Sequence, residues 1–457
     1  MNTSEFHVIT SERETLAFHL PTFSLLRVPP VMADYLRGEE VSDVPEEVRQ
    51  LHSHMETILS RQPRVTWAEP ENHVTFVVTQ QCNLACTYCF ATGGSYGLPI
   101  GRMSRQTAVM ALRVFEQQGP IKSITFFGGE PTLNLDAIEA VCADLKSCHE
   151  QGDISTLPHY MIVTNGTNLT KRALHVINAY SINPIVSIDG PESVCSVTRT
   201  NQGGRSAFPQ IVNGIRTLQS DTALPVMYEA TYTSVHEDQH VTLADVVRYM
   251  KDTLGLDTGT LAFYAGDQGD PMSPNRTDRS LAYRQVTDAI LESLTTGASP
   301  ILNDTVLSLL RSIVSRESYQ HVCTLGKHQW AVMPNGDVYP CHLFINASND
   351  FRMGNVHDEN FGPQSSLWQG VMDRLGGLDK QENGRCAKCW AQRLCKGCPG
   401  AQYVSKGVAR EMQADHCAFF RSQVDHMLVR LADIQRDPAK WHALKQSLGA
   451  FSESSSC

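Results

Sequence analysis

The chain has 457 residues, of which 41% are hydrophobic and 19% are charged, an ordinary balance for a globular protein of about two to four domains. Its net charge of -10 argues against broad nucleic-acid binding, because neutralising phosphates requires clustered lysine and arginine. The sequence has no apolar run of the roughly 18 residues that a membrane span needs, and its N-terminus lacks a signal-peptide pattern. We therefore expect a cytoplasmic protein with neither nucleic-acid nor membrane partners.

Residues 1–70 are expected to form a separate module. The stretches "EFHVIT", "TLAFHLP" and "FSLLRV" are rich in β-branched and aromatic residues, which is typical of short strands. Two helices are predicted to follow, in "PPVMADYLRG" and "PEEVRQLHSHMETILSRQ". Three strands plus helices suggest a small winged-helix-like module. It carries no cluster of catalytic residue types, so we expect it to bind a partner or to pack against the next domain.

From residue 71 to residue 310, apolar strand candidates alternate with helical stretches. This alternation predicts a parallel sheet with helical crossovers, and the polar and glycine residues fall where α/β barrels build their sites. The strand candidates are "HVTFVVT", "SITFFGG", "YMIVTNG", "NPIVSIDG", "PVMYEATYT" and "TGTLAFY". The helical stretches are "SRQTAVMALRVFEQQG" (with Ser104 as the expected N-cap), "NLDAIEAVCADLKSC", "KRALHVINAY", "AFPQIVNGIRTLQ" and "LADVVRYMKDTLG".

The rest of the chain divides into a cysteine-rich part and a tail. Residues 311–425 hold seven cysteines among many glycines and turns, which predicts a loop-rich module ordered by metal. Residues 426–457 are expected to form a helical tail with a polar end. Fourteen cysteines in a cytosolic chain favour metal binding or catalysis over disulfides.

The stretch "VTQQCNLACTYCFATGGSYG" places three cysteines, Cys82, Cys86 and Cys89, directly after the first strand of the barrel. Four thiolates normally complete an iron–sulfur or zinc site, and C-x3-C-x2-C supplies three. One reading is a [4Fe–4S] cluster with one iron left open for an exchangeable ligand. The other is a structural zinc site that borrows a remote fourth ligand.

The motif "CNLACTYCFA" resembles the signature of the radical SAM superfamily, and "FFGGEP", "VTNGT" and "SIDGP" extend the resemblance along the following strands. The resemblance implies a partial (β/α)6 barrel in which S-adenosylmethionine chelates the open iron. An electron from the cluster then cleaves the sulfonium, and the resulting 5'-deoxyadenosyl radical abstracts hydrogen from the substrate. The cofactors perform this step while the protein positions and shields them.

The same resemblance assigns roles to individual residues. Cys82, Cys86 and Cys89 would be the catalytic cluster ligands. Gly128 and Gly129 would let the backbone approach the methionine moiety, Glu130 would accept from its amino group, and Arg199 would pair with its carboxylate. Asn165 and Ser187 would contact ribose or carboxylate, and Phe90 would lie near the adenine. Asn165 could also be a simple turn former before Gly166. Asp189, by contrast, is interpreted mainly as a turn former.

The C-terminal cysteines have a spacing of their own. Cys323 is followed after twelve residues by Gly336 and after four more by Cys341. A zinc ribbon would separate its C-x2-C pairs by about fifteen residues, whereas "CAKCWAQRLCKGC" separates them by five. The pattern resembles the SPASM domain, although that family usually has three residues before its last central cysteine and this chain has two. Binding of two zinc ions remains the alternative.

The resemblance to the SPASM domain implies two auxiliary [4Fe–4S] clusters. One would be held by Cys386, Cys389, Cys395 and Cys417, and the other by Cys323, Cys341 and Cys398 with an open or borrowed position. Cys142 and Cys195 are expected to be buried thiols. Cys148 and Cys457 are assigned no function.

Several stretches, among them "YCFATGGSYG" and "EATYTSVH", resemble SPASM peptide maturases, which install thioether or carbon–carbon crosslinks in ribosomal peptides. The resemblance implies a precursor peptide or protein as substrate and an electron donor such as flavodoxin or ferredoxin. The N-terminal module would then recognise the leader of the peptide, by adding a strand to a sheet edge. An anaerobic sulfatase-type maturase that makes formylglycine is the second reading, and a non-catalytic cysteine-rich scaffold is a third.

Overall fold

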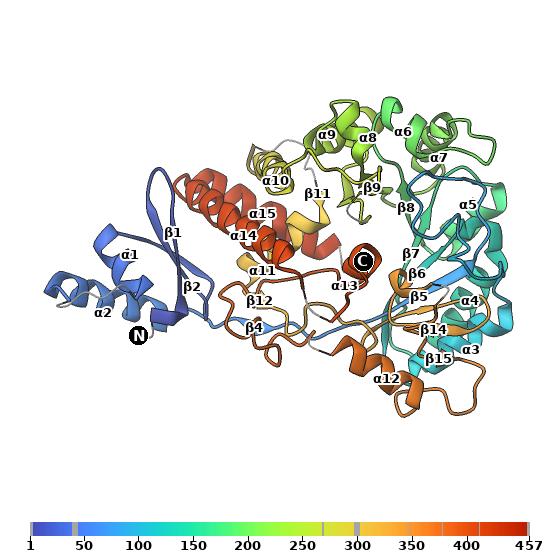
Figure 1. Ribbon diagram of the computed structural model, residues 1–457, viewed down its shortest axis with the longest axis horizontal. Helices are drawn as coiled ribbons and strands as arrows, with labels where there is room; N and C mark the ends of the chain where they lie inside the picture. Colours follow the sequence, from blue (N-terminus) through green and yellow to red (C-terminus); the bar gives the residue numbers. More distant parts are fainter. Residues whose placement is uncertain are drawn as a thin grey trace.

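The computed structural model of the protein describes residues 3–38, 44–266, 269–296, 302–346, 348–376, 378–410 and 412–454. Its central feature is a ten-stranded sheet of order β11-β10-β9-β8-β7-β6-β5-β13-β14-β15 (Figure 1). None of the helices in these ranges is long and apolar enough to cross a membrane. Cys457 lies outside the described residues.

Six parallel strands in the middle of this sheet are the six strands that the sequence predicts. They are β5 (Asn72–Thr79), β6 (Ile121–Gly128), β7 (His159–Thr164), β8 (Asn183–Ser187), β9 (Met227–Tyr232) and β10 (Thr258–Phe263). In β7, β8 and β9 fully buried residues alternate with partly buried ones, as expected when one face packs on helices and the other lines the inside. The α/β class with parallel strands is confirmed.

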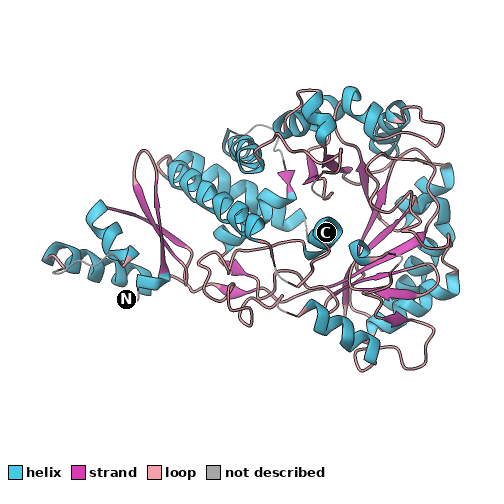
Figure 2. Cartoon of the chain, in the orientation of Figure 1, coloured by secondary structure: helices cyan, strands magenta, loops and turns pink. Residues whose placement is uncertain are grey.

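The crossover helices cover the outer side of the sheet (Figure 2). Ser104 is the N-cap of the first of them, since its side chain accepts from the backbone N–H of Thr107, as predicted. The helices that connect the strands are α3 (Arg105–Glu116), α4 (Leu135–Gln151), α5 (Lys171–Ala179), α6 (Glu192–Thr198), α7 (Phe208–Asp221), α8 (Ser234–Asp238) and α9 (Leu243–Leu254), with the 3-10 turn η2 (Pro131–Asn134) before α4.

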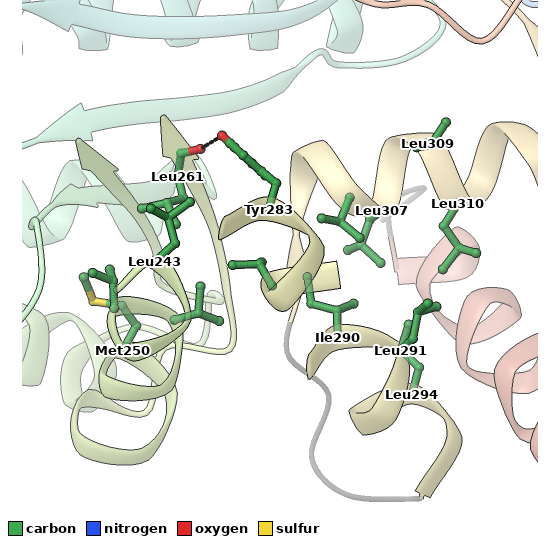
Figure 3. Packing of buried hydrophobic residues seen from close by; sticks show 14 of the residues in the cluster. Leu243, Met250, Leu261, Tyr283, Ile290, Leu291, Leu294, Leu307, Leu309 and Leu310 are labelled. Atoms are coloured by element: carbon green, nitrogen blue, oxygen red, sulfur yellow. Dashed lines mark hydrogen bonds between the residues drawn. The ribbon is translucent and has the colours of Figure 1, made fainter. Parts of the chain in front are cut away.

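A second group of helices packs beside β10. Its members are α10 (Arg279–Thr296), α11 (Asp304–Ser315), α14 (Ala414–Gln435) and α15 (Pro438–Ser454). Figure 3 shows apolar side chains of α10 (Ile290, Leu291 and Leu294) and of α11 (Leu307 and Leu310) in the same buried cluster. The Tyr283 hydroxyl donates to the Leu261 carbonyl at 2.8 Å. Neither α10 nor α11 is among the predicted helices, whereas α14 and α15 are.

The cysteine-rich segment continues the barrel sheet. β13 (Gln329–Val332) pairs in parallel with β5, and β14 (Asp337–Tyr339) and β15 (Gly354–Asn355) follow as antiparallel neighbours. The segment is otherwise loop-rich, as predicted, with η3 (His342–Phe344), α12 (Ser366–Leu375) and α13 (Pro399–Lys406). Two short strands pair in parallel with other segments. β11 (Leu302–Asn303) pairs with β10, and β12 (Glu317–Ser318) pairs with β4 (Thr66–Trp67).

The N-terminal module is a three-stranded antiparallel sheet followed by two helices. After the turn η1 (Thr3–Glu5) come β1 (Phe6–Thr10), β2 (Thr15–His19), β3 (Ser24–Val28), α1 (Pro30–Arg37) and α2 (Glu46–Ser60). The predicted strands and helices are therefore present, but a winged-helix-like arrangement is not confirmed. The module lies at one end of the molecule beside α14 (Figure 1). There the His7 ring stacks on Trp390 with centroids 3.4 Å apart, and its Nε2 lies 2.7 Å from Asp425.

Candidate active site

The first three cysteines lie in the loop that follows β5, at the carboxyl edge of the sheet. The loop is tied to the segment after α6, since the Ala85 N–H donates to the Thr200 carbonyl at 2.7 Å and the Thr87 N–H donates to the Thr198 carbonyl at 2.9 Å. Cys82 interacts electrostatically with both Cys86 and Cys89, so the fold brings the three thiols together.

The chemistry of this donor set suits an iron–sulfur cluster. Burial raises the pKa of the Cys82 thiol to about 11 and also raises that of Cys86, so both thiolates need a cationic partner. Across the described ranges, no three His, Cys, Asp or Glu side chains converge as the ligands of one metal ion would. A loop with three thiols supplies one ligand fewer than the usual four, which suits a four-iron cluster with one open iron.

Two glycines lock the end of β6 against the cysteine loop. A Cβ on Gly128 would lie 2.2 Å from the Thr79 carbonyl oxygen, and one on Gly129 would lie 2.2 Å from that of Gln81 and 2.9 Å from the Cys82 nitrogen. The Gly129 N–H donates to the Thr79 carbonyl at 2.9 Å. Glycine is therefore required at both positions so that the end of β6 can contact the cysteine loop. The resemblance implies a second reason, the approach of this backbone to the methionine moiety of the cofactor.

We predict that Gly129→Ala will release the cysteine loop and lower the iron content by about four atoms per chain, because the new methyl group would meet backbone that cannot move aside. Gly370→Ala is the matched control. Gly370 lies in helix α12, and a Cβ at this position would meet no atom within 4 Å. Anaerobic iron and sulfide determination after reconstitution measures both variants. Full iron content in Gly129→Ala would contradict the prediction.

Glu130 is fully buried, and its carboxylate is occupied by the protein itself. Oε1 accepts from the backbone and hydroxyl of Thr132, at 3.1 and 2.7 Å, and from the Thr164 hydroxyl at 2.7 Å. Oε2 accepts from the Asn165 N–H at 2.8 Å. Burial raises the pKa of Glu130 although these donors oppose the shift. The side chain joins β6 to β7, and its predicted contact with the amino group of S-adenosylmethionine remains a prediction.

Asn165, Ser187 and Phe90 each have a defined place in the structure. The Asn165 amide nitrogen lies 4.0 Å from the Cys82 sulfur and donates to the Asn83 side chain at 2.8 Å, while its oxygen accepts from Thr167 as a turn former does. Ser187 ends β8 opposite Glu229 of β9 and is partly exposed. Phe90 is 41% exposed, with its ring 6.0 Å from that of His342. Their predicted cofactor contacts remain predictions.

Arg199 forms a buried ion pair with Asp189. Its Nε and Nη2 each donate to one carboxylate oxygen at 3.0 Å, and its guanidinium lies 5.5 Å from the centre of the Tyr88 ring. The Tyr88 hydroxyl donates to the same carboxylate at 2.7 Å. Burial alone would raise the pKa of Asp189, but Arg199 and the other donors hold it below its ordinary value. The arginine thus pairs with a carboxylate of its own chain, and pairing with a cofactor carboxylate remains a prediction.

Sequence reasoning undervalued Asp189. It is fully buried and also accepts from the Thr198 hydroxyl at 2.8 Å and the Thr231 N–H at 3.1 Å, while its own carbonyl bonds to His236 at 2.8 Å. These contacts join the cysteine loop, α6, β9 and α8. The sequence offered one signal for this role: Asp189 follows a predicted strand and precedes Arg199 by ten positions.

The C-terminal cysteines influence one another's electrostatics, and their assignment to two clusters remains a prediction. Cys395 interacts electrostatically with Cys386, Cys389 and Cys417. Cys341 interacts with Cys323 and Cys398, and the Gln329 side chain lies between Cys323 and Cys341, 3.6 and 3.8 Å from their sulfurs. Cys142 and Cys195 are fully buried, as predicted, and Cys148 is buried beside Arg113.

Other residues near these sets were not anticipated. His342 follows Cys341, and its ring is tilted against that of Phe127 with centroids 4.7 Å apart. Burial lowers the pKa of His342 to about 4. Lys380 is 1% exposed beside Cys395. Neither residue lies in a recognisable motif. The only signal for His342 in the sequence is that it follows Cys341, whereas the proximity of Lys380 to Cys395 is visible only in the structure.

This geometry agrees with what comparison finds. Residues 76–221 match the radical SAM superfamily, so this part of the chain is a radical SAM domain. Residues 323–390 match an iron–sulfur cluster-binding domain, the SPASM domain. The cofactors are accordingly S-adenosylmethionine and [4Fe–4S] clusters, including auxiliary clusters of the SPASM domain.

Among known proteins, GTP 3',8-cyclase of Listeria welshimeri is 27% identical over 183 residues, which are 40% of this chain and 51% of the cyclase, so the chain spans about half the length of such relatives. A cysteine-type anaerobic sulfatase-maturating enzyme of Clostridium perfringens is 23% identical over 375 residues, 77% of this chain and 95% of that one.

Two solved structures share the fold. The anaerobic sulfatase-maturating enzyme anSMEcpe with bound AdoMet has a TM-score of 0.65 at 20% identity, covering 82% of this chain and 98% of its own. Streptococcus suis SuiB bound to precursor peptide SuiA has a TM-score of 0.52 at 14% identity, covering 91% and 98%. The likeness to both concerns the fold.

Proposed function

We propose that the chain is a peptide maturase that installs an intramolecular thioether or carbon–carbon crosslink in a ribosomally made precursor peptide. The observation that carries this proposal is the N-terminal sheet, which is anchored next to a cysteine of the auxiliary set. His7 of β1 stacks on Trp390, the neighbour of Cys389. A sheet held in this way is suited to binding one part of a peptide while another part reaches the barrel.

The chemistry is divided between cofactors and protein. When bound, the cluster and S-adenosylmethionine supply a radical that removes a hydrogen atom from the substrate. The chain contributes the thiols of Cys82, Cys86 and Cys89 and the glycine contact that fixes their loop. It also contributes the Asp189–Arg199 pair, which contacts Tyr88 of that loop. The inner face of the sheet would hold the peptide residue to be modified and limit access of water.

The two edges of the N-terminal sheet are candidates for leader recognition. In the order β1-β2-β3, strands β1 and β3 each have one strand neighbour among the described residues. Unpaired backbone N–H and C=O groups on such an edge can accept an extended peptide as a further strand. The module has its own small core, which includes Phe6, Ala17, Val28 and Met32, and so offers a formed surface to the leader.

We expect removal of residues 1–64 to reduce turnover of the leader-bearing peptide at least tenfold, because affinity contributed by the leader would be lost. This boundary spares β4, which pairs with β12. The test substrate is a leader-bearing precursor peptide, to be sought among short reading frames beside the gene, and the product is detected by a two-hydrogen mass loss. Iron content and peptide-independent release of 5'-deoxyadenosine serve as the control for folding. Unchanged turnover would refute leader recognition.

A formylglycine-generating maturase is the second candidate. The similarity to the Clostridium perfringens enzyme over 95% of that protein's length favours it. Oxidising a peptide serine also removes two hydrogens, so mass alone does not separate the two reactions. Reaction of the product with hydroxylamine does, because an aldehyde forms an oxime and a crosslink does not.

A further inference from the structure

Lys380 is one of the largest fully buried side chains of the described structure, with 1% of its surface exposed. Its Nζ donates to the Cys395 carbonyl at 3.1 Å. Its strongest interactions with anionic groups are with the thiolates of Cys395 and Cys386. The ammonium group therefore lies beside Cys395 and is shielded from water.

A buried ammonium is costly unless an anion lies close to it. Within the ranges that the structure describes, no carboxylate forms an ion pair with Lys380. The neighbouring Asp379 is instead engaged by the Gln320 amide at 3.0 Å, by the Gln381 N–H at 2.8 Å and by His321 at 3.6 Å. The remaining source of negative charge is the thiolate set, and a four-iron cluster bound by four thiolates keeps a net negative charge.

We propose that Lys380 is a positioning residue that raises the reduction potential of the auxiliary cluster held by Cys386, Cys389, Cys395 and Cys417. Adding one electron increases the negative charge of the cluster by one unit, and a fixed buried cation stabilises that reduced form more than the oxidised one. The cluster would thereby accept an electron more readily. The inference rests on the proposed grouping of the four cysteines and is independent of the peptide substrate.

Lys388 provides a matched comparison. It lies between Cys386 and Cys389 in the sequence, but its side chain is exposed. Water and salt screen an exposed charge, so its effect on the cluster should be small even though it is close. Replacing each lysine by methionine removes the same charge and keeps a side chain of similar length.

The experiment is a reductive titration followed by electron paramagnetic resonance, on full-length protein carrying Cys82→Ala, Cys86→Ala and Cys89→Ala so that the auxiliary signals remain. The signal of interest is the one that disappears on adding Cys417→Ala. We expect Lys380→Met to change the ratio of reduced to oxidised cluster at least tenfold at a fixed potential, a shift of about 59 mV to lower potential for one electron. Lys388→Met should shift it less than half as far, and Lys380→Arg should leave it near the parent value.

Each outcome decides the proposal. Equal shifts in Lys380→Met and Lys388→Met, or none, would overturn it. Loss of the cluster in Lys380→Met but not in Lys380→Arg would support a requirement for the charge, whereas loss in both would assign the residue a packing role and refute the proposal. Absence of any signal sensitive to Cys417→Ala would overturn the cysteine grouping and this inference together, with no bearing on the crosslinking reaction.

Discussion

Replacing Cys82, Cys86 and Cys89 together by alanine is expected to abolish the release of 5'-deoxyadenosine and to lower the iron content from about twelve to about eight atoms per chain. The three thiols are brought together on one loop, and the other seven clustered cysteines are grouped among themselves. Among the described residues, the other clustered cysteines are predicted to serve the auxiliary clusters, so we expect none of them to rescue the site. Anaerobic reconstitution, iron determination and chromatography of the reaction with dithionite and S-adenosylmethionine measure the change.

Cys142→Ala and Cys195→Ala are suitable controls for this loss. Both side chains are fully buried and neither belongs to the predicted ligands; Cys142 lies in the core of helix α4, and the Cys195 thiol donates to the Gly190 carbonyl at 3.2 Å. Each variant should keep its full iron content and its 5'-deoxyadenosine release, at a modest cost in stability from the lost sulfur atom. Release of 5'-deoxyadenosine by the triple variant, or zinc in place of iron in the parent protein, would refute the assignment of this loop.

The parallel strands could be predicted because their apolar runs are short, rich in β-branched residues and bounded by polar turns. The two-residue strands β4, β11, β12 and β15 could not, because their pairing depends on segments far away in the sequence. Helix α10 is buried on several sides by α9, α14 and α15, so its apolar residues do not form one clear stripe.

The residues of the site likewise divide into those that the sequence predicts and those that depend on tertiary contacts. Cysteine spacing sufficed to single out ten cysteines, since metal ligands come in fixed sequence patterns. The partners of Gly129, Glu130 and Arg199 could not be read from spacing, because Gln81, Thr164 and Asp189 reach them through tertiary contacts. Asp189 was undervalued for this reason, because an ordinary turn can also contain the "IDG" motif. Only the burial of Asp189 and the five donors to its carboxylate distinguish it from such a turn.

Arg199→Met is expected to destabilise the protein by about 3–5 kcal/mol, because it leaves the carboxylate of Asp189 buried without its cation. The side chains of Arg199 and Asp189 are 8% and 0% exposed, so water cannot replace the lost partner. The midpoint of urea unfolding, measured anaerobically on the reconstituted protein, reports the change. A midpoint within error of the parent would show that the pair contributes little to folding.

The double variant Asp189→Asn/Arg199→Met separates the cost of the stranded charge from the loss of the arginine's packing. Removing both charges should recover a substantial part of the stability, because a neutral amide is far cheaper to bury than a carboxylate. The Tyr88 hydroxyl loses its ionic acceptor in the double variant. Since Tyr88 lies between Cys86 and Cys89, iron content and 5'-deoxyadenosine release should stay reduced even where stability returns. Recovery of both together would mean that the network stabilises the fold without positioning the cysteine loop.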